Sequence, residues 1–219
     1  MLLSSLQWAF WVVGLGLQIL LILTLSQGAG RYFPTVYAYI VCLLGTTVAD
    51  ILAVQILGRK SAGYLNYYWS AELVRQSVLF VLVVSLAIHV APVNRRTNAM
   101  TRLMGFGAAA IWLGSVAICH SPNLNTWMTT VVRNLSFFTG ILNLIVWFLC
   151  ARSETRDPQR LMIAGGLGLQ MTGEAIGQAL RQMRVSHEVT VAGSIFIVLT
   201  HLLCLFIWWR ALTVDERYA

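Results

Sequence analysis

The chain has 219 residues, of which 58% are hydrophobic and 11% are charged, and its mean hydropathy is +0.74. Soluble domains carry roughly 25% charged residues, so this composition excludes an ordinary soluble domain and indicates an integral membrane protein in contact with the lipid bilayer. The formal net charge is +7, but the arginines lie mostly in short gaps between apolar runs, which favours a role in membrane orientation and argues against nucleic-acid binding.

Seven apolar segments reach the length of about 20 residues that a helix needs to cross the hydrocarbon layer. The first contains no charge up to position 30, so it lacks the basic segment of a cleavable signal peptide and is expected to remain as a span. In chain order the predicted helices are 5–26, 35–57, 67–92, 102–120, 127–151, 161–183 and 189–211. The sequence therefore predicts an all-α integral membrane protein, a seven-transmembrane-helix bundle that forms a single domain over residues 1–219.

The basic residues between these segments predict the orientation of the bundle. With the N-terminus outside, the inner segments contain nine arginines and the outer segments contain four basic residues. Basic residues accumulate on the cytoplasmic side of membrane proteins. We therefore expect the N-terminus out and the C-terminus in, in a multi-pass protein of a bacterial inner membrane.

A weak internal repeat appears when the chain is shifted against itself. Segment 69–80 (WSAELVRQSVLF) aligns with segment 127–138 (WMTTVVRNLSFF), so that Arg75 meets Arg133. Farther on, residues 102–104 and 160–162 are both Arg-Leu-Met. Since each copy contains two helices, we expect a parallel duplication of the hairpins formed by the third and fourth and by the fifth and sixth helices.

Six charged side chains within the apolar segments are predicted to lie in the outer half of the membrane: Asp50, Glu72, Arg75, Arg133, Glu174 and Arg181. Charges in a membrane helix are costly unless they are paired, and three acids and three bases can neutralise each other. Glu72 and Arg75 share one helix face at i, i+3. Polar or aromatic residues lie close by in the sequence, namely Tyr68, Trp69, Gln76, Trp127, Asn134, Gln170 and Gln178.

The sixth predicted helix combines a polar stripe with glycines. Gln170, Glu174, Gln178 and Arg181 recur at helical spacing, and Gly165, Gly166, Gly168, Gly173 and Gly177 lie on the same segment. The glycines permit close helix packing or leave space for a ligand. Likewise, the charges either form interhelical ion pairs that fix the bundle, or line an outward-facing pocket for a small polar or zwitterionic molecule.

Several chemistries lack their signature residues. The seventh helix contains no lysine, which excludes a retinal Schiff base, and no G-x-S-x-G or H-E-x-x-H motif occurs. The histidines (His89, His120, His187 and His201) share no depth that suits haem or zinc, and the four cysteines lie singly in apolar runs. We therefore expect no enzyme activity, no cofactor and no metal.

Three short motifs carry a family resemblance: Phe33-Pro34 with Tyr39, Tyr68-Trp69 with Glu72, and a glycine-rich sixth helix with Glu174. With these motifs the chain resembles an uncharacterised bacterial family of seven-helix membrane proteins of about this length. The resemblance covers most of the chain and implies a topology, but no activity.

The leading functional hypothesis is a receptor-like protein that binds or senses a small molecule and signals through a membrane or cytoplasmic partner. The predicted ligand-binding residues are Asp50, Tyr68, Trp69, Glu72, Arg75, Arg133, Gln170 and Glu174. In this hypothesis Arg75 and Arg133 hold anionic groups, and the glutamates orient them or accept protons. The alternatives are a small-molecule transporter and a structural subunit of a larger membrane complex.

Overall fold

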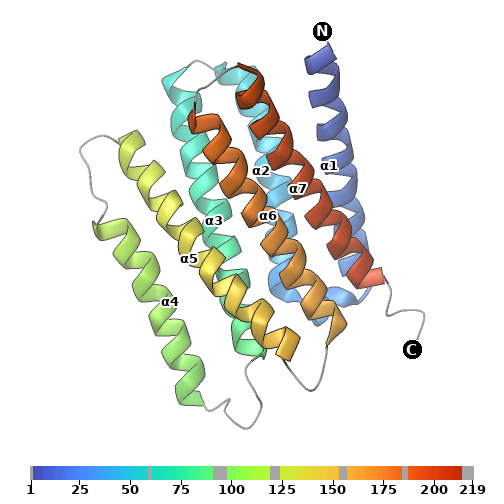
Figure 1. Cartoon of the computed structure of the whole chain (residues 1–219), viewed down its shortest axis with the longest axis vertical. Coiled ribbons are helices and arrows are strands. Elements are labelled where there is room, and N and C mark those ends of the chain that lie inside the picture. The colour runs from blue at the N-terminus through green and yellow to red at the C-terminus, as the bar shows by residue number, and fades with distance from the viewer. Residues whose placement is uncertain are drawn as a thin grey trace. The chain divides into compact units, whose positions relative to one another are not determined.

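The computed structural model describes residues 2–58, 61–90, 98–118, 124–152, 157–183 and 187–213. In these ranges all regular structure is helical (Figure 1). The helices are α1 (Leu2–Ser26), η1 (Ala29–Arg31, a 3-10 helix), α2 (Pro34–Leu57), α3 (Ala62–Val90), α4 (Asn98–Ile118), α5 (Leu124–Arg152), α6 (Pro158–Met183) and α7 (His187–Thr213). The predicted seven long helices are confirmed, and η1 is the element that hydropathy did not reveal.

Five helices are long and apolar enough to cross a membrane. The qualifying segments are Ala9–Ser26, Pro34–Leu57, Ala62–Val90, Thr130–Arg152 and Glu188–Thr213. Within α4 a shorter apolar stretch, Gly105–Ala117, is found, and α6 falls short because glutamines, glycines and charges interrupt its apolar residues. Multi-pass membrane character is thus supported by five of the seven predicted spans.

Local capping explains why α3 begins at Ala62, five residues before the predicted start. The Ser61 hydroxyl accepts a hydrogen bond from the Tyr64 backbone N–H at 3.0 Å, which satisfies one of the free donors of the first turn. Gly58, with φ of 73°, ends α2 in the left-handed conformation that glycine adopts without strain. Hydropathy finds the span but does not find these caps.

The chain divides into two compact units. Unit 1 comprises Met1–Pro34 and Cys150–Ala219 and contains α1, η1, α6 and α7. Unit 2 comprises Thr35–Leu149 and contains α2 to α5. The single domain predicted over residues 1–219 stays a prediction.

In unit 1, α7 packs against both α1 and α6. A Cβ atom added at Gly173 or Gly177 would overlap side chains of α7, namely those of Thr200 and Ile197. At Gly166 an added Cβ would come within 3.1 Å of Trp208, whose indole N–H donates to the Ile163 carbonyl at 2.9 Å. These glycines therefore bring α6 and α7 close together, which is the packing role that the sequence left open.

In unit 2, hydrogen bonds from aromatic side chains join consecutive helices. The Tyr64 hydroxyl of α3 donates to Asp50 of α2 at 3.0 Å. The Trp112 indole of α4 donates to the Ser77 hydroxyl of α3 at 3.0 Å, and the Trp127 indole of α5 donates to the Val116 carbonyl of α4 at 3.1 Å. The buried face of α3 lies in its second half and consists of Gln76, Leu79, Phe80, Leu82, Val83, Leu86 and Ala87.

Candidate functional site

The predicted site residues belong to both units. Unit 2 contains Asp50, Tyr68, Trp69, Glu72, Arg75 and Arg133, and unit 1 contains Gln170 and Glu174. The predicted meeting of the two groups stays a prediction.

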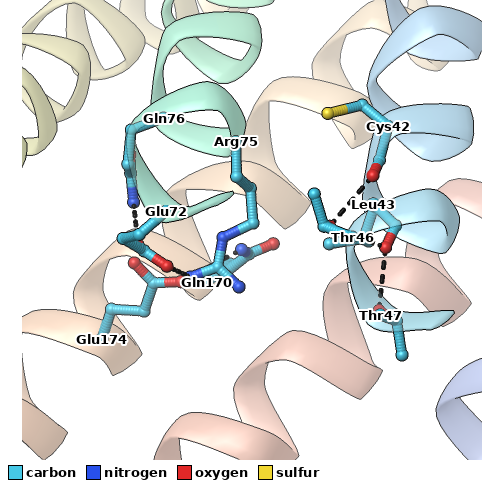
Figure 2. A network of polar contacts seen from close by, with 9 residues as sticks. All are labelled: Cys42, Leu43, Thr46, Thr47, Glu72, Arg75, Gln76, Gln170 and Glu174. Carbon is cyan, nitrogen blue, oxygen red and sulfur yellow. Dashed lines mark hydrogen bonds and ion pairs between the residues drawn. The ribbon is translucent and has the colours of Figure 1, made fainter. Parts of the chain in front are cut away.

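Glu72 is the centre of a polar network on α3 (Figure 2). Its Oε2 accepts from Arg75 Nη2 at 2.5 Å, and its Oε1 accepts from Gln76 Nε2 at 3.3 Å. The side chain of Glu72 is 13% exposed and that of Arg75 is 35% exposed. The i, i+3 spacing correctly predicted this ion pair, which neutralises both charges within one helix.

Gln76 supplies a polar atom that the sequence-based site omitted. The residue is only 3% exposed, and its Oε1 has no hydrogen-bond partner among the described residues. The orientation of the amide follows from its neighbour, because an ionised carboxylate accepts hydrogen bonds and attracts the NH₂ group. The Nε2 atom of Gln76 therefore faces Glu72, and its acceptor atom, Oε1, is the one without a partner among the described residues.

Trp69 contributes a buried hydrogen-bond donor, whereas Gln76 contributes a buried acceptor. Its indole Nε1 is buried and has no hydrogen-bond partner in the described part of the chain. The Tyr68 ring lies edge-on to the indole, with centroids 5.3 Å apart. Positions 69, 72 and 76 follow one another at i, i+3 and i+7, so Trp69, Glu72 and Gln76 form one stripe along α3, here called the α3 polar stripe.

Asp50 and Glu72 lie at different positions along the axis of the α2–α3 hairpin. The partner of Asp50 is the Tyr64 hydroxyl, and one turn away the Tyr67 hydroxyl donates to the Thr46 carbonyl at 3.4 Å. In this antiparallel register Glu72 is level with Cys42. At a rise of 1.5 Å per residue, Asp50 lies about 12 Å farther along the helix axis. The structure thus separates Asp50 from the α3 polar stripe, although the sequence placed both at one depth.

Arg133 is exposed on α5. Four of the buried residues of α5 recur every fourth position, at Val131, Leu135, Thr139 and Asn143. Position 133 is about 200° around the helix from position 131, so it lies on the opposite face. Arg133 makes no ion pair with a described residue of unit 2, so the structure does not bring it to Glu72 as the sequence predicted.

In unit 1, α6 repeats the contact between an amide and a carboxylate. Gln170 Nε2 donates to Glu174 Oε1 at 3.2 Å; Gln170 is 3% exposed, and its Oε1 has no hydrogen-bond partner among the described residues (Figure 2). Gln178, on the same predicted stripe, is exposed. The predicted side-chain position of Arg181 lies outside what the structure describes.

Metal ligands do not gather in the part of the chain that the structure describes. In those ranges no group of three or more His, Cys, Asp or Glu could hold a metal ion. Cys42, Cys150 and Cys204 are free thiols. His120 and Cys119 lie outside the described residues.

Together these features define a helical membrane protein with several apolar spans, in which polar side chains concentrate on α3 and α6. Comparison of the chain with protein-family models, with curated proteins and with solved structures found no match.

Proposed function

We propose that the protein is a receptor-like membrane protein that binds a small polar or zwitterionic ligand on the α3 polar stripe. The observation that carries this proposal is a pair of buried atoms, Trp69 Nε1 and Gln76 Oε1, that have no hydrogen-bond partner among the described residues. A buried donor or acceptor left unpaired costs about 1–3 kcal/mol, and a ligand that pairs with it recovers part of that cost. Membrane proteins keep polar groups within their spanning helices mainly where these groups line a substrate path or a binding site.

The alternative role of the charges, as locks between helices, has less support. Both members of the Glu72–Arg75 ion pair lie on α3, at i, i+3. Hydrogen bonds from Tyr64, Trp112 and Trp127 already join the helices of unit 2. The ion pair is then best explained as the charged part of a binding surface.

The proposal retains the predicted orientation, with the N-terminus outside. In that orientation the first half of α3 would be accessible from the outer side of a bacterial inner membrane. Ligand binding would be relayed to a partner protein by the basic inner segments between α3 and α4 and between α5 and α6. Membership of the uncharacterised family that the chain resembles belongs to the same proposal.

Thermal unfolding of the detergent-solubilised full chain tests ligand binding. Glycine, 4-aminobutyric acid and 6-aminohexanoic acid serve as zwitterionic probes, and sucrose serves as an uncharged one. A probe present at 100 times its Kd should stabilise the folded state by about 2.7 kcal/mol and raise Tm. If none of the probes raises Tm, the proposal is wrong.

Two further measurements distinguish a receptor from a transporter and from a structural subunit. Time-dependent accumulation of a stabilising probe inside protein-containing vesicles would indicate transport. Stable co-purification of another membrane protein, with no Tm response to any probe, would indicate a structural subunit.

A further inference from the structure

The two α3 atoms that lack a hydrogen-bond partner in the described ranges differ in character and in position. Trp69 Nε1 is a donor, so it requires an acceptor, whereas Gln76 Oε1 is an acceptor, so it requires a donor. The two residues are seven positions apart, almost in line along the helix and about 10 Å apart along its axis. A single hydrogen-bonding group cannot satisfy both atoms.

The end of the stripe at Gln76 favours a cation. Here Gln76 Oε1 lies one helical turn from the Glu72 carboxylate, whose oxygens retain free lone pairs beside the bonds to Arg75 and Gln76. An ammonium group has three donors and no acceptor, so it can bond both Gln76 Oε1 and the remaining lone pairs of the Glu72 carboxylate. At the other end the indole N–H of Trp69 offers only a donor, which suits a carboxylate.

The stripe has no net charge of its own, because Arg75 compensates Glu72 within the same helix. A ligand with net charge would therefore bring an uncompensated charge into the span, which is costly, whereas a net-neutral ligand would not. This favours a molecule whose own positive and negative ends cancel.

From these three observations we infer that the ligand is an ω-amino acid or a similar linear zwitterion, bound along α3 with its ammonium end at Gln76 and Glu72 and its carboxylate end at Trp69. This inference rests on the proposed function and adds the class and the direction of the ligand. It also predicts an optimum length, since a short chain cannot reach both atoms.

Isothermal titration of the solubilised full chain tests the two ends separately. The probes are glycine, 4-aminobutyric acid, 6-aminohexanoic acid and 8-aminooctanoic acid, with butylamine and butyrate as one-ended probes. Affinity should be highest for a zwitterion of intermediate length and at least about tenfold lower for either one-ended probe, because each lacks one charge-assisted hydrogen bond.

Two variants assign the ends. Trp69→Phe keeps an aromatic ring but removes the N–H, so it should weaken the zwitterion and butyrate about fivefold to tenfold and leave butylamine unchanged. Gln76→Leu should weaken the zwitterion and butylamine by a similar factor and leave butyrate unchanged. Gln76→Met provides a second variant of similar size for the case that Gln76→Leu does not fold.

Matched controls exist on α3 and on α4. Asn66→Leu changes an exposed amide of α3 and should leave every affinity unchanged. Trp112→Phe removes an indole N–H that already bonds Ser77, so it should lower Tm without altering the preference between the two ends.

The outcomes separate this inference from the function on which it rests. If a zwitterion binds but both variants weaken the two one-ended probes equally, or neither variant changes any affinity, the inferred direction is wrong. If sucrose alone binds, the protein is a receptor for another class of ligand and the inference fails by itself. If no probe binds, the inference and the proposed function fail together.

Discussion

Arg75 and Arg133 show how differently one residue type can be used at aligned positions. Arg75 is 35% exposed and pairs with Glu72, which lies one turn before it on α3. Arg133 is exposed on α5, where Thr130 occupies the position equivalent to Glu72. Phe80 and Phe138 are also aligned, yet they are 4% and 39% exposed. The aligned segments therefore have different surroundings, and the duplication stays a prediction.

Removing Arg75 should be much more harmful than removing Arg133. Arg75→Met leaves the largely buried Glu72 carboxylate without its cation, and we expect a loss of about 1–3 kcal/mol, reduced from the value for fully buried pairs because Arg75 is partly exposed. Arg133→Met should change stability by no more than about 0.5 kcal/mol. Urea unfolding in detergent, followed by tryptophan fluorescence, measures both.

The double variant identifies the cause of that loss. Glu72→Gln in the Arg75→Met chain removes the unpaired charge, so it should restore most of the lost stability. Equal losses for Arg75→Met and Arg133→Met, or no recovery in the double variant, would contradict the assignment of Glu72 as the partner.

For single residues, the sequence predicted the contacts that depend only on spacing along one helix. The Glu72–Arg75 pair follows from i, i+3, and the candidate role of Trp69 followed from its place beside Glu72. The sequence did not place Arg133, because α5 is apolar on both faces and its hydrophobic pattern does not define a buried side. The bond between Asp50 and Tyr64 depends on the register of the α2–α3 hairpin, which no local pattern specifies.

Among the helices, the contact between α6 and α7 depends most on single atoms. Gly173→Ala would place a methyl group inside the Thr200 side chain, which itself is 6% exposed. Either the rotamer of Thr200 or the separation of the helices must change, at a cost of about 1–3 kcal/mol. We expect a correspondingly lower Tm in detergent.

A glycine in open surroundings provides the control for that prediction. An added Cβ at Gly140 of α5 meets nothing within 4 Å. Gly140→Ala should leave stability unchanged or raise it by up to about 1 kcal/mol, since alanine is the better helix former. If Gly140→Ala lowers Tm as much as Gly173→Ala, close packing at Gly173 is not the reason for the loss.

The start of α3 offers a second test at the level of one element. Ser61→Ala removes the acceptor for the Tyr64 N–H and should cost about 1 kcal/mol. Hydrogen exchange followed by mass spectrometry should show faster exchange confined to the first turns of α3. Ser70→Ala, which removes an exposed hydroxyl bonded to the Asn66 carbonyl, should not change exchange there.

For the whole molecule, hydropathy correctly predicted the number of long helices. It did not establish that each of these helices crosses the membrane. The five most apolar helices pass the test of length and composition, whereas α6 does not. Its glycines are used for packing against α7, and its polar side chains include the buried Gln170. Such a helix can span a membrane only when other helices cover its polar face, and a count of apolar residues does not report that cover.

The orientation depends on whether both α4 and α6 cross, because each uncrossed helix would move the following segments to the other side. With seven spans, nine basic residues lie inside and four outside, which favours the N-terminus outside. The same arrangement places the end of α5 inside and the start of α7 outside. Arg152 and Glu188 are exposed residues at these two points.

Cysteine labelling of intact cells tests this topology. In a chain whose four native cysteines are replaced by alanine, Glu188→Cys should react with a membrane-impermeant maleimide, because it faces the outer side. Arg152→Cys should react only after the membrane is permeabilised. Reaction of both from outside would show that α6 does not cross, and the reverse pattern would invert the bundle. If α4 crosses, both results would place the start of α3 inside, and the first half of α3 would lose its proposed access to an external ligand.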